Sequence, residues 1–234
     1  MNEVGHLRRF TAARVGLGRA GHAVPTPAQL DFAEAHARAR DAVWSALDAE
    51  VLAAACALPA ARVRSEARDR REFLLRPDLG RRLAEPHGLT AQPGCIALVL
   101  ADGLCAEGVQ RHAPALVAAL AGSLPDPVLV IAEQARVALG DAVGEALGAA
   151  AVVMLIGERP GLSATDSIGA YITWAPRIGR TDAERNCISN IRPGGLGAED
   201  AAEKIVWLLG AACALGATGV ALKDEQPATP LLLP

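Results

Sequence analysis

The sequence predicts an α/β protein in which an N-terminal helical region precedes a Rossmann-like, mainly parallel βαβ domain. Two observations support this fold class. The first ninety or so residues are rich in Ala, Glu, Arg and Leu, which favour helices. After Gly94, short apolar runs alternate with longer amphipathic segments, the pattern of buried parallel strands joined by crossover helices. We therefore expect two regions, 1–93 and 94–234.

In the first region we expect one long helix from Pro27 to Leu58. Thr26 suits its N-cap and Pro27 its first turn, while Leu30 and Trp44 fall on its predicted inner face. Two shorter helices should follow, at about 67–75 and 78–83, ahead of a linker at 86–93.

In the second region three apolar runs predict parallel strands, and two segments between them predict crossover helices. The stretch 158–197 is dense in Gly, Pro, Ser, Asp and Asn and too long for an idle connection, so we expect a functional or interface loop there. The expected strands are 95–101, 128–132, 151–157 and 219–222; the expected helices are 106–121, 139–149 and 199–215, before a proline-rich tail.

Composition limits the possible functions. The 234 residues are 51% apolar and can bury a sizeable core, while 23 basic and 26 acidic residues are mixed along the chain and leave a net charge of -3. We therefore expect neither nucleic-acid binding nor a membrane span. Five scattered cysteines without a CxxC pair indicate reduced thiols in the cytoplasm, and the first 21 residues lack the continuous apolar stretch of a secretory signal.

A literal GxGxxG occurs at Gly16, Gly18 and Gly21, the pattern of a dinucleotide-binding turn. It would allow a stand-alone nucleotide-binding α/β oxidoreductase. No convincing strand precedes the glycines, however, and residues 22–27 cannot open a helix. A loop that packs against the helical region is the plainer interpretation.

The carboxyl ends of the three expected strands place Asp102, Glu133 and Glu158 at one edge of the sheet, with Val137 just after the second. Open α/β sheets bind ligands at this edge. Carboxylates gathered there can be metal ligands or acid–base groups, whereas the glycines around them suit a bulky organic ligand. Asp102 and Glu158 can equally be caps of the segments that follow. Spacing alone does not choose between these alternatives.

Cys187 lies in a run of Arg, Asn and Ser donors interleaved with apolar residues, at 185–193. Such a mixture can hold a ligand or a protein. A catalytic cysteine needs a histidine nearby in the fold, and none of the five histidines is an obvious partner. We therefore interpret Cys187 as a contact or packing residue and assign no catalytic residue.

The run from Ile156 to Arg192, "IGERPGLSATDSIGAYITWAPRIGRTDAERNCISNIR", closely resembles the small subunit of ethanolamine ammonia-lyase. Four further blocks resemble that family in the same order. Together they cover nearly the whole chain and are far more specific than the glycine motif. They are "VGLGRAG" at 15–21, "DFAEAHARARDAVW" at 31–44, "LADGLCAEGVQRHA" at 100–113 and "ARVALGDAVGEALGA" at 135–149.

The resemblance implies a subunit of an adenosylcobalamin-dependent enzyme that converts ethanolamine to acetaldehyde and ammonia by radical chemistry. The cofactor lies between this subunit and a large catalytic subunit, in a trimer of heterotetramers. Region 94–234 would contact cobalamin through Val137, Glu158 and Cys187, and region 1–93 would contact the partner. No residue need ligate cobalt. The chain lacks the DxHxxG motif of many other cobalamin domains, which agrees with a base-on cofactor.

Family members from ethanolamine-degrading enteric bacteria carry a longer N-terminal extension than this sequence. We therefore expect a cytoplasmic location, with a bacterial microcompartment as the alternative. The resemblance also leaves open a scaffold subunit that stabilises the large subunit without touching the cofactor.

Overall fold

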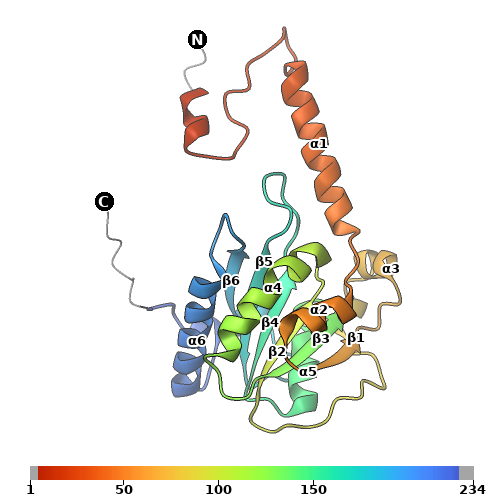
Figure 1. The fold of residues 1–234 in the computed structure, drawn as a ribbon, viewed down its shortest axis with the longest axis vertical. Coiled ribbons are helices and arrows are strands. Elements are labelled where there is room, and N and C mark those ends of the chain that lie inside the picture. The colour runs from red at the N-terminus through yellow and green to blue at the C-terminus, as the bar shows by residue number, and fades with distance from the viewer. Residues whose placement is uncertain (1–4, 227–234) are drawn as a thin grey trace.

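A computed structural model describes residues 5–226, which form a six-stranded sheet and six α-helices (Figure 1). The end of the expected proline-rich tail, 227–234, lies outside the described residues. The helices are α1 (Thr26–Val43), α2 (Ala49–Cys56), α3 (Arg70–Leu75), α4 (Ala106–Ala121), α5 (Leu139–Leu147) and α6 (Ala198–Leu215). The strands are β1 (Ala60–Arg64), β2 (Ile96–Ala101), β3 (Val128–Glu133), β4 (Ala151–Gly157), β5 (Ile168–Trp174) and β6 (Asn186–Ile191).

The sheet is mixed, with the strand order β1-β3-β2-β4-β5-β6. Strands β1, β3, β2 and β4 pair in parallel, whereas β5 and β6 add an antiparallel edge to β4. The mixed α/β class is therefore confirmed. Because β2, β3 and β4 all run in one direction, their carboxyl ends meet at one edge of the sheet.

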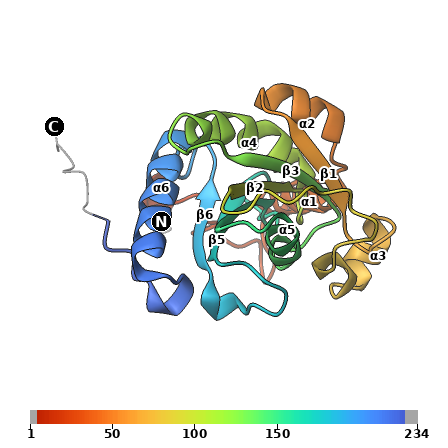
Figure 2. The ribbon, with the colours of Figure 1, turned by 90° about the horizontal axis from the view of Figure 1, so that it is seen from below.

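Helices cover both faces of the sheet, and the strand period of two divides the core accordingly. On β2, Leu98 and Leu100 face the layer formed by α2, α4 and α6, while Ala97 and Val99 face α5 (Figure 2). All four side chains are fully buried. Near-continuous apolar runs such as Ala151–Gly157 therefore belong to a strand covered on both sides, which is why they carry no alternation. Among the described residues, no helix is long and apolar enough to cross a bilayer.

The expected single helix at 27–58 is wrong, because the chain breaks after Val43. Trp44 closes α1, and the Asp48 carboxylate accepts a hydrogen bond from the backbone N–H of Val51 to begin α2. The predicted inner face is wrong as well: Leu30 is 63% exposed and Trp44 is 54% exposed. The reason is that α1 projects away from the sheet and packs only near its C-terminal end (Figure 1).

Three strands escaped prediction, and one predicted strand is absent. β1 lies in the region expected to be wholly helical, and β5 and β6 lie within the stretch expected to be a loop. Residues 219–222 contain a single 3₁₀ turn, Gly219–Ala221, instead of a strand. Since β1 pairs with β3, residues from both expected regions build this sheet. The division at 93/94 remains a prediction.

Candidate functional site

A cavity of about 460 Å³ opens at the carboxyl edge of the parallel strands. Three connections and one strand of the antiparallel edge form it: the β2–α4 turn, the β3–α5 turn, the segment after β4, and β5. Its lining residues are Gly103, Leu104, Arg136, Val137, Ile156, Gly157, Glu158, Arg159 and Tyr171. Two of the three expected ligand-contacting residues, Val137 and Glu158, therefore line one cavity.

Two glycines let the backbones of the cavity floor approach closely. A Cβ on Gly103 would lie 2.3 Å from the carbonyl oxygen of Gly157, and a Cβ on Gly157 would lie 2.5 Å from that of Asp102. Leu104 donates its N–H to the Gly157 carbonyl at 2.9 Å, which joins the two turns. A side chain at either glycine would have to displace main chain, so the floor is bare backbone.

Asp102 stands behind this floor and does not face the cavity. It is 2% exposed, and its carboxylate accepts the backbone N–H groups of Gln134 at 2.9 Å and Ala135 at 3.0 Å. Arg70 approaches it at 3.4 Å. Burial raises the pKa of Asp102 to about 6, against the opposing effect of these donors. Asp102 thus fixes the β3–α5 turn that carries Val137, which is closer to the capping interpretation than to an acid–base role.

Glu158 follows β4 and is held from two sides. Its carboxylate accepts the hydroxyl of Ser167 at 2.6 Å and the backbone N–H of Asn190 at 3.1 and 3.2 Å. These contacts tie the end of β4 to the chain before β5 and to the end of β6. The half-buried Glu158 is therefore oriented before any ligand arrives.

Cys187 lies beside the cavity instead of lining it. It is exposed on β6, where it pairs in register with Tyr171 of β5, and its Sγ lies 3.4 Å from Ser189 Oγ. Burial, together with neighbouring Cys187 and Glu158, raises the pKa of Tyr171 to about 12. Tyr171 thus connects Cys187 to the cavity. Sequence reasoning missed this tyrosine because β5 was not predicted.

The described residues do not form the arrangement that metal binding or dinucleotide binding would need. Among residues 5–226, no three His, Cys, Asp or Glu side chains are grouped so that they could hold a metal ion. The glycines of the GxGxxG run have positive φ angles and lie between a 3₁₀ turn, Gly5–Arg9, and α1. A dinucleotide fingerprint needs a strand directly before the glycines, and the described chain has none there.

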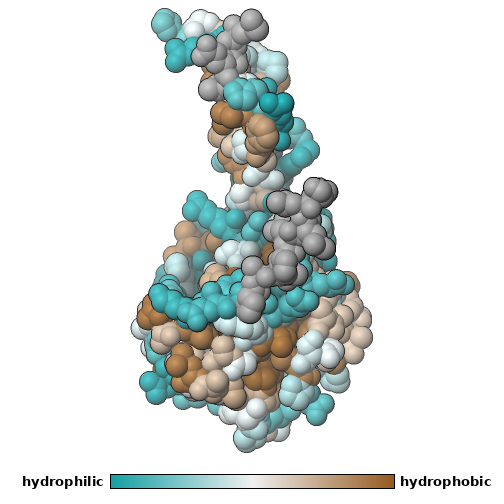
Figure 3. Space-filling view, turned by 90° about the vertical axis from the view of Figure 1, so that its left-hand side faces the viewer, coloured by the Kyte–Doolittle hydropathy of each residue, from teal (hydrophilic) through white to brown (hydrophobic). Residues whose placement is uncertain are grey.

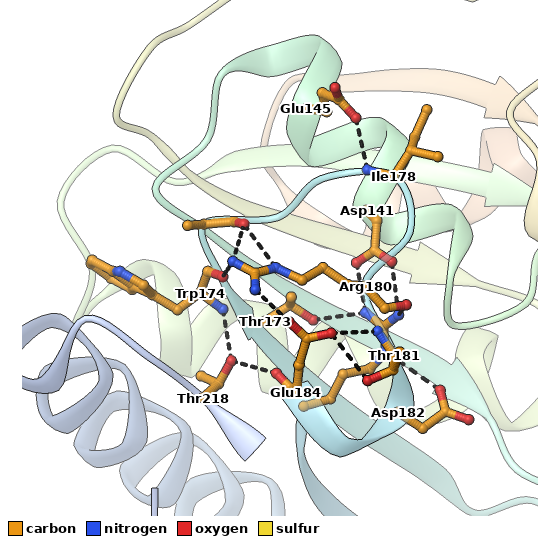
Figure 4. A network of polar contacts seen from close by, with 12 residues as sticks. Asp141, Glu145, Thr173, Trp174, Ile178, Arg180, Thr181, Asp182, Glu184 and Thr218 are labelled. Carbon is orange, nitrogen blue, oxygen red and sulfur yellow. Dashed lines mark hydrogen bonds and ion pairs between the residues drawn. The ribbon is translucent and has the colours of Figure 1, made fainter. Parts of the chain in front are cut away.

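A second, larger cavity of about 840 Å³ runs along α5 on the face of the sheet that α5 covers. Among the residues that line it, Arg185 makes a two-point contact with Asp141, at 2.6 and 2.7 Å, and also donates to Thr173 and to the Arg180 carbonyl. Figure 4 labels Asp141, Thr173 and Arg180 of this network. Both Arg185 and Asp141 are almost fully buried. This network braces the loop between β5 and β6 against α5.

The fold and the cavity at the strand ends define an α/β protein with a polar-rimmed cavity at the carboxyl edge of its sheet. Comparisons with known proteins identify the family. A family model described as ethanolamine ammonia-lyase light chain (EutC) matches residues 1–223. The chain belongs to this family.

Three relatives illustrate the likeness, and each is an ethanolamine ammonia-lyase small subunit. The protein from Bradyrhizobium diazoefficiens is 54% identical, over 94% of this chain and 90% of its own length. That from Rhodopseudomonas palustris is 50% identical, over 94% of this chain and 89% of its own. That from Ralstonia nicotianae is 50% identical, over 97% of this chain and 89% of its own. The family expected from the sequence blocks is thus confirmed, and a stand-alone oxidoreductase is not supported.

Proposed function

We propose that this chain is the cobalamin-binding small subunit of an adenosylcobalamin-dependent ethanolamine ammonia-lyase, which converts ethanolamine to acetaldehyde and ammonia. The observation that carries the proposal is the cavity at the carboxyl edge, where Val137 and Glu158 meet and Cys187 stands beside them through Tyr171. The parallel part of the sheet then acts as a Rossmann-like support for the contacts in region 94–234.

The residues of the cavity suit a large organic ligand with a rim of amide groups. Gly103 and Gly157 leave bare backbone for close approach, and Arg136 keeps a buried Nε without a hydrogen-bond partner. When bound, adenosylcobalamin supplies radical chemistry through homolysis of its cobalt–carbon bond.

The chain's own part is to bind, orient and exclude water. The Glu158 carboxylate accepts hydrogen bonds from ligand amides, Val137 offers its backbone or an apolar contact, and Cys187 packs alongside. None of these residues ligates cobalt or reacts, which agrees with a base-on cofactor and with the absence of a proposed catalytic residue.

Region 1–93 supplies contacts to the large subunit, chiefly through α1. Leu30 and Phe32 are exposed on a helix that stands clear of the sheet, and Figure 3 shows hydrophobic residues on this protruding part. An isolated helix of this length is marginal in water, so a partner would stabilise it. Arg70 donates to the carbonyls of Val43 and Gly103, at 2.7 and 2.8 Å. The base of α1 therefore lies beside the carboxyl edge, where a partner could cover both.

The assembly we propose is a trimer of heterotetramers with the large subunit. We place it in the cytoplasm, with a bacterial microcompartment as the alternative. Neither nucleic acid nor a membrane is a proposed partner.

The first experiment is to purify the chain and the large subunit separately and together. Ethanolamine deamination is assayed with added adenosylcobalamin while cofactor retention is followed by absorbance. We expect activity and retained cofactor only in the mixture. A large subunit that is fully active alone would refute the proposal.

Glu158→Gln separates a cofactor-binding subunit from a passive scaffold. The amide replaces one acceptor oxygen, so we expect cofactor affinity in the complex to fall about tenfold, while assembly is retained. Glu203→Gln, on the exposed surface of α6, is the matched control and should leave affinity unchanged. A scaffold would tolerate both changes equally.

Leu30→Ser tests the partner contact of α1. Because Leu30 is exposed, we expect the isolated chain to keep its thermal unfolding temperature but the complex to dissociate at higher protein concentration in gel filtration. Val51→Ser, at an exposed position of α2, is the control. Equal assembly of the two variants would contradict a docking role for α1.

A further inference from the structure

Two arginines line the carboxyl-edge cavity without a carboxylate partner. Arg136 comes from the turn between β3 and α5, and Arg159 follows β4. In the part of the chain that the structure describes, neither takes part in an ion pair, and the exposed Arg159 side chain has no hydrogen-bond partner. Glu158, their neighbour on the rim, is directed toward Ser167 and Asn190. The cavity therefore offers positive charge that the protein does not neutralise.

The Arg136 guanidinium is held in place by Phe73, and its hydrogen-bond donors are not all used. Its guanidinium carbon lies 4.3 Å from the centre of the Phe73 ring, and its Nη2 donates to the Phe73 carbonyl at 3.2 Å. Its Nε is buried and lacks a partner. Burial lowers the pKa of Arg136, and the positive charges of Arg70 and Arg81 lower it further. A half-buried cation among other cations is costly until an anion arrives.

The carboxylate behind the floor offsets this charge only in part: Asp102 raises the pKa of Arg136, but its effect is smaller than those of burial, Arg70 and Arg81. Asp102 already accepts two backbone N–H groups and the contact from Arg70. Two arginine side chains thus line the cavity, and guanidinium groups favour phosphate.

We propose that Arg136 and Arg159 bind the phosphodiester of the cofactor's nucleotide tail, an inference that rests on the proposed function. The side-chain amides and the adenosyl group of adenosylcobalamin are neutral, and the phosphodiester is the anionic group at its periphery. Arg136, fixed on Phe73, forms the preformed half of the site. Arg159, exposed and unpartnered, closes onto the phosphate from the rim. The two arginines therefore select for cofactors that carry the tail.

The test is equilibrium binding to the assembled complex, measured by absorbance after ultrafiltration. The ligands are adenosylcobalamin, adenosylcobinamide phosphate and adenosylcobinamide, the last of which lacks both phosphate and nucleotide. For Arg159→Gln and Arg136→Lys we expect an affinity loss of about tenfold for the two phosphate-bearing ligands. Affinity for adenosylcobinamide should stay unchanged.

Arg177→Gln is the matched control, because Arg177 is exposed in the loop after β5, outside the cavity lining. It should bind all three ligands as the unmodified complex does. Equal losses for adenosylcobinamide, or no loss for either arginine variant while Glu158→Gln still weakens binding, would overturn the phosphate site and spare the proposed function. If Glu158→Gln and both arginine variants all leave every affinity unchanged, the proposed function itself fails.

Discussion

Two buried aspartate–arginine pairs lie on opposite sides of the turn between β3 and α5, and they are built differently. Asp141 and Arg185 face each other through two short hydrogen bonds, and Thr173 and the Arg180 carbonyl take further donors of Arg185 (Figure 4). Its Nε has no hydrogen bond but lies 3.5 Å from Asp182 Oδ1. Asp102 and Arg70 share one contact of 3.4 Å, and Arg70 Nη2 has no partner.

The difference is in how fully the hydrogen-bonding groups of each pair are used within the protein. The Asp141–Arg185 network uses nearly all its hydrogen-bonding capacity within the protein, so it can fix the β5–β6 loop but has little to offer a ligand. Around Asp102 the carboxylate is satisfied by backbone, while Arg70 and Arg136 keep buried donors without partners. Buried donors without partners are costly, and two of them lie close to the carboxyl edge.

The largest expected effect comes from Asp141→Asn. This change leaves Arg185 as a buried cation without its counter-ion, and breaking such a pair costs about 3–5 kcal/mol. We expect the free energy of unfolding of the isolated chain, from urea denaturation, to fall by about this amount. Asp182→Asn is the control: Asp182 is 96% exposed, and its loss should leave the unfolding midpoint nearly unchanged. If the two substitutions lowered the free energy of unfolding equally, the Asp141–Arg185 network would not stabilise the fold as expected.

A smaller, pH-dependent effect is expected for Asp102→Asn. The folded-state pKa of about 6 lies above the ordinary aspartate value, so protonated Asp102 adds stability that is fully present below about pH 4 and lost as pH rises through 6. Asn cannot titrate. The cost of the substitution should therefore be about 2 kcal/mol greater at pH 4 than at pH 7. Urea denaturation across this range measures it, and a cost independent of pH would disprove the raised pKa.

Apolar pattern located the centre of the sheet but not its edges. β2, β3 and β4 are short and almost continuously apolar, a pattern that is typical of buried strands. β1 reads "AARVR" and has a single buried residue, Val63, because it is an edge strand with half its surface in solvent. β5 and β6 lie among the Gly, Pro and Asn residues of the long stretch 158–197, whose composition is that of a loop. β5 pairs with β4 and β6 pairs with β5, each with its neighbour along the chain, so it was the loop-like composition that concealed them and not their distance in sequence.

The candidate site, like the sheet, was predicted only in part from the sequence. Strand ends placed Val137 and Glu158 at one edge, and both line the cavity. Asp102 was expected there too, but its side chain turns inward to the backbone of the next turn, a choice that spacing cannot show. Cys187 rested on family resemblance, and its neighbour Tyr171 required the unpredicted register between β5 and β6. The unpaired state of Arg136 and Arg159 is visible only in three dimensions.

The strand order has a consequence for how the protein is made. β1 lies at the edge of the sheet and pairs with β3, which begins at Val128, 68 residues after β1 begins at Ala60. On a ribosome adding roughly 5–20 residues per second, β1 leaves the exit tunnel several seconds before its partner. During that interval its unpaired backbone and the apolar residues of α1 are open to other chains.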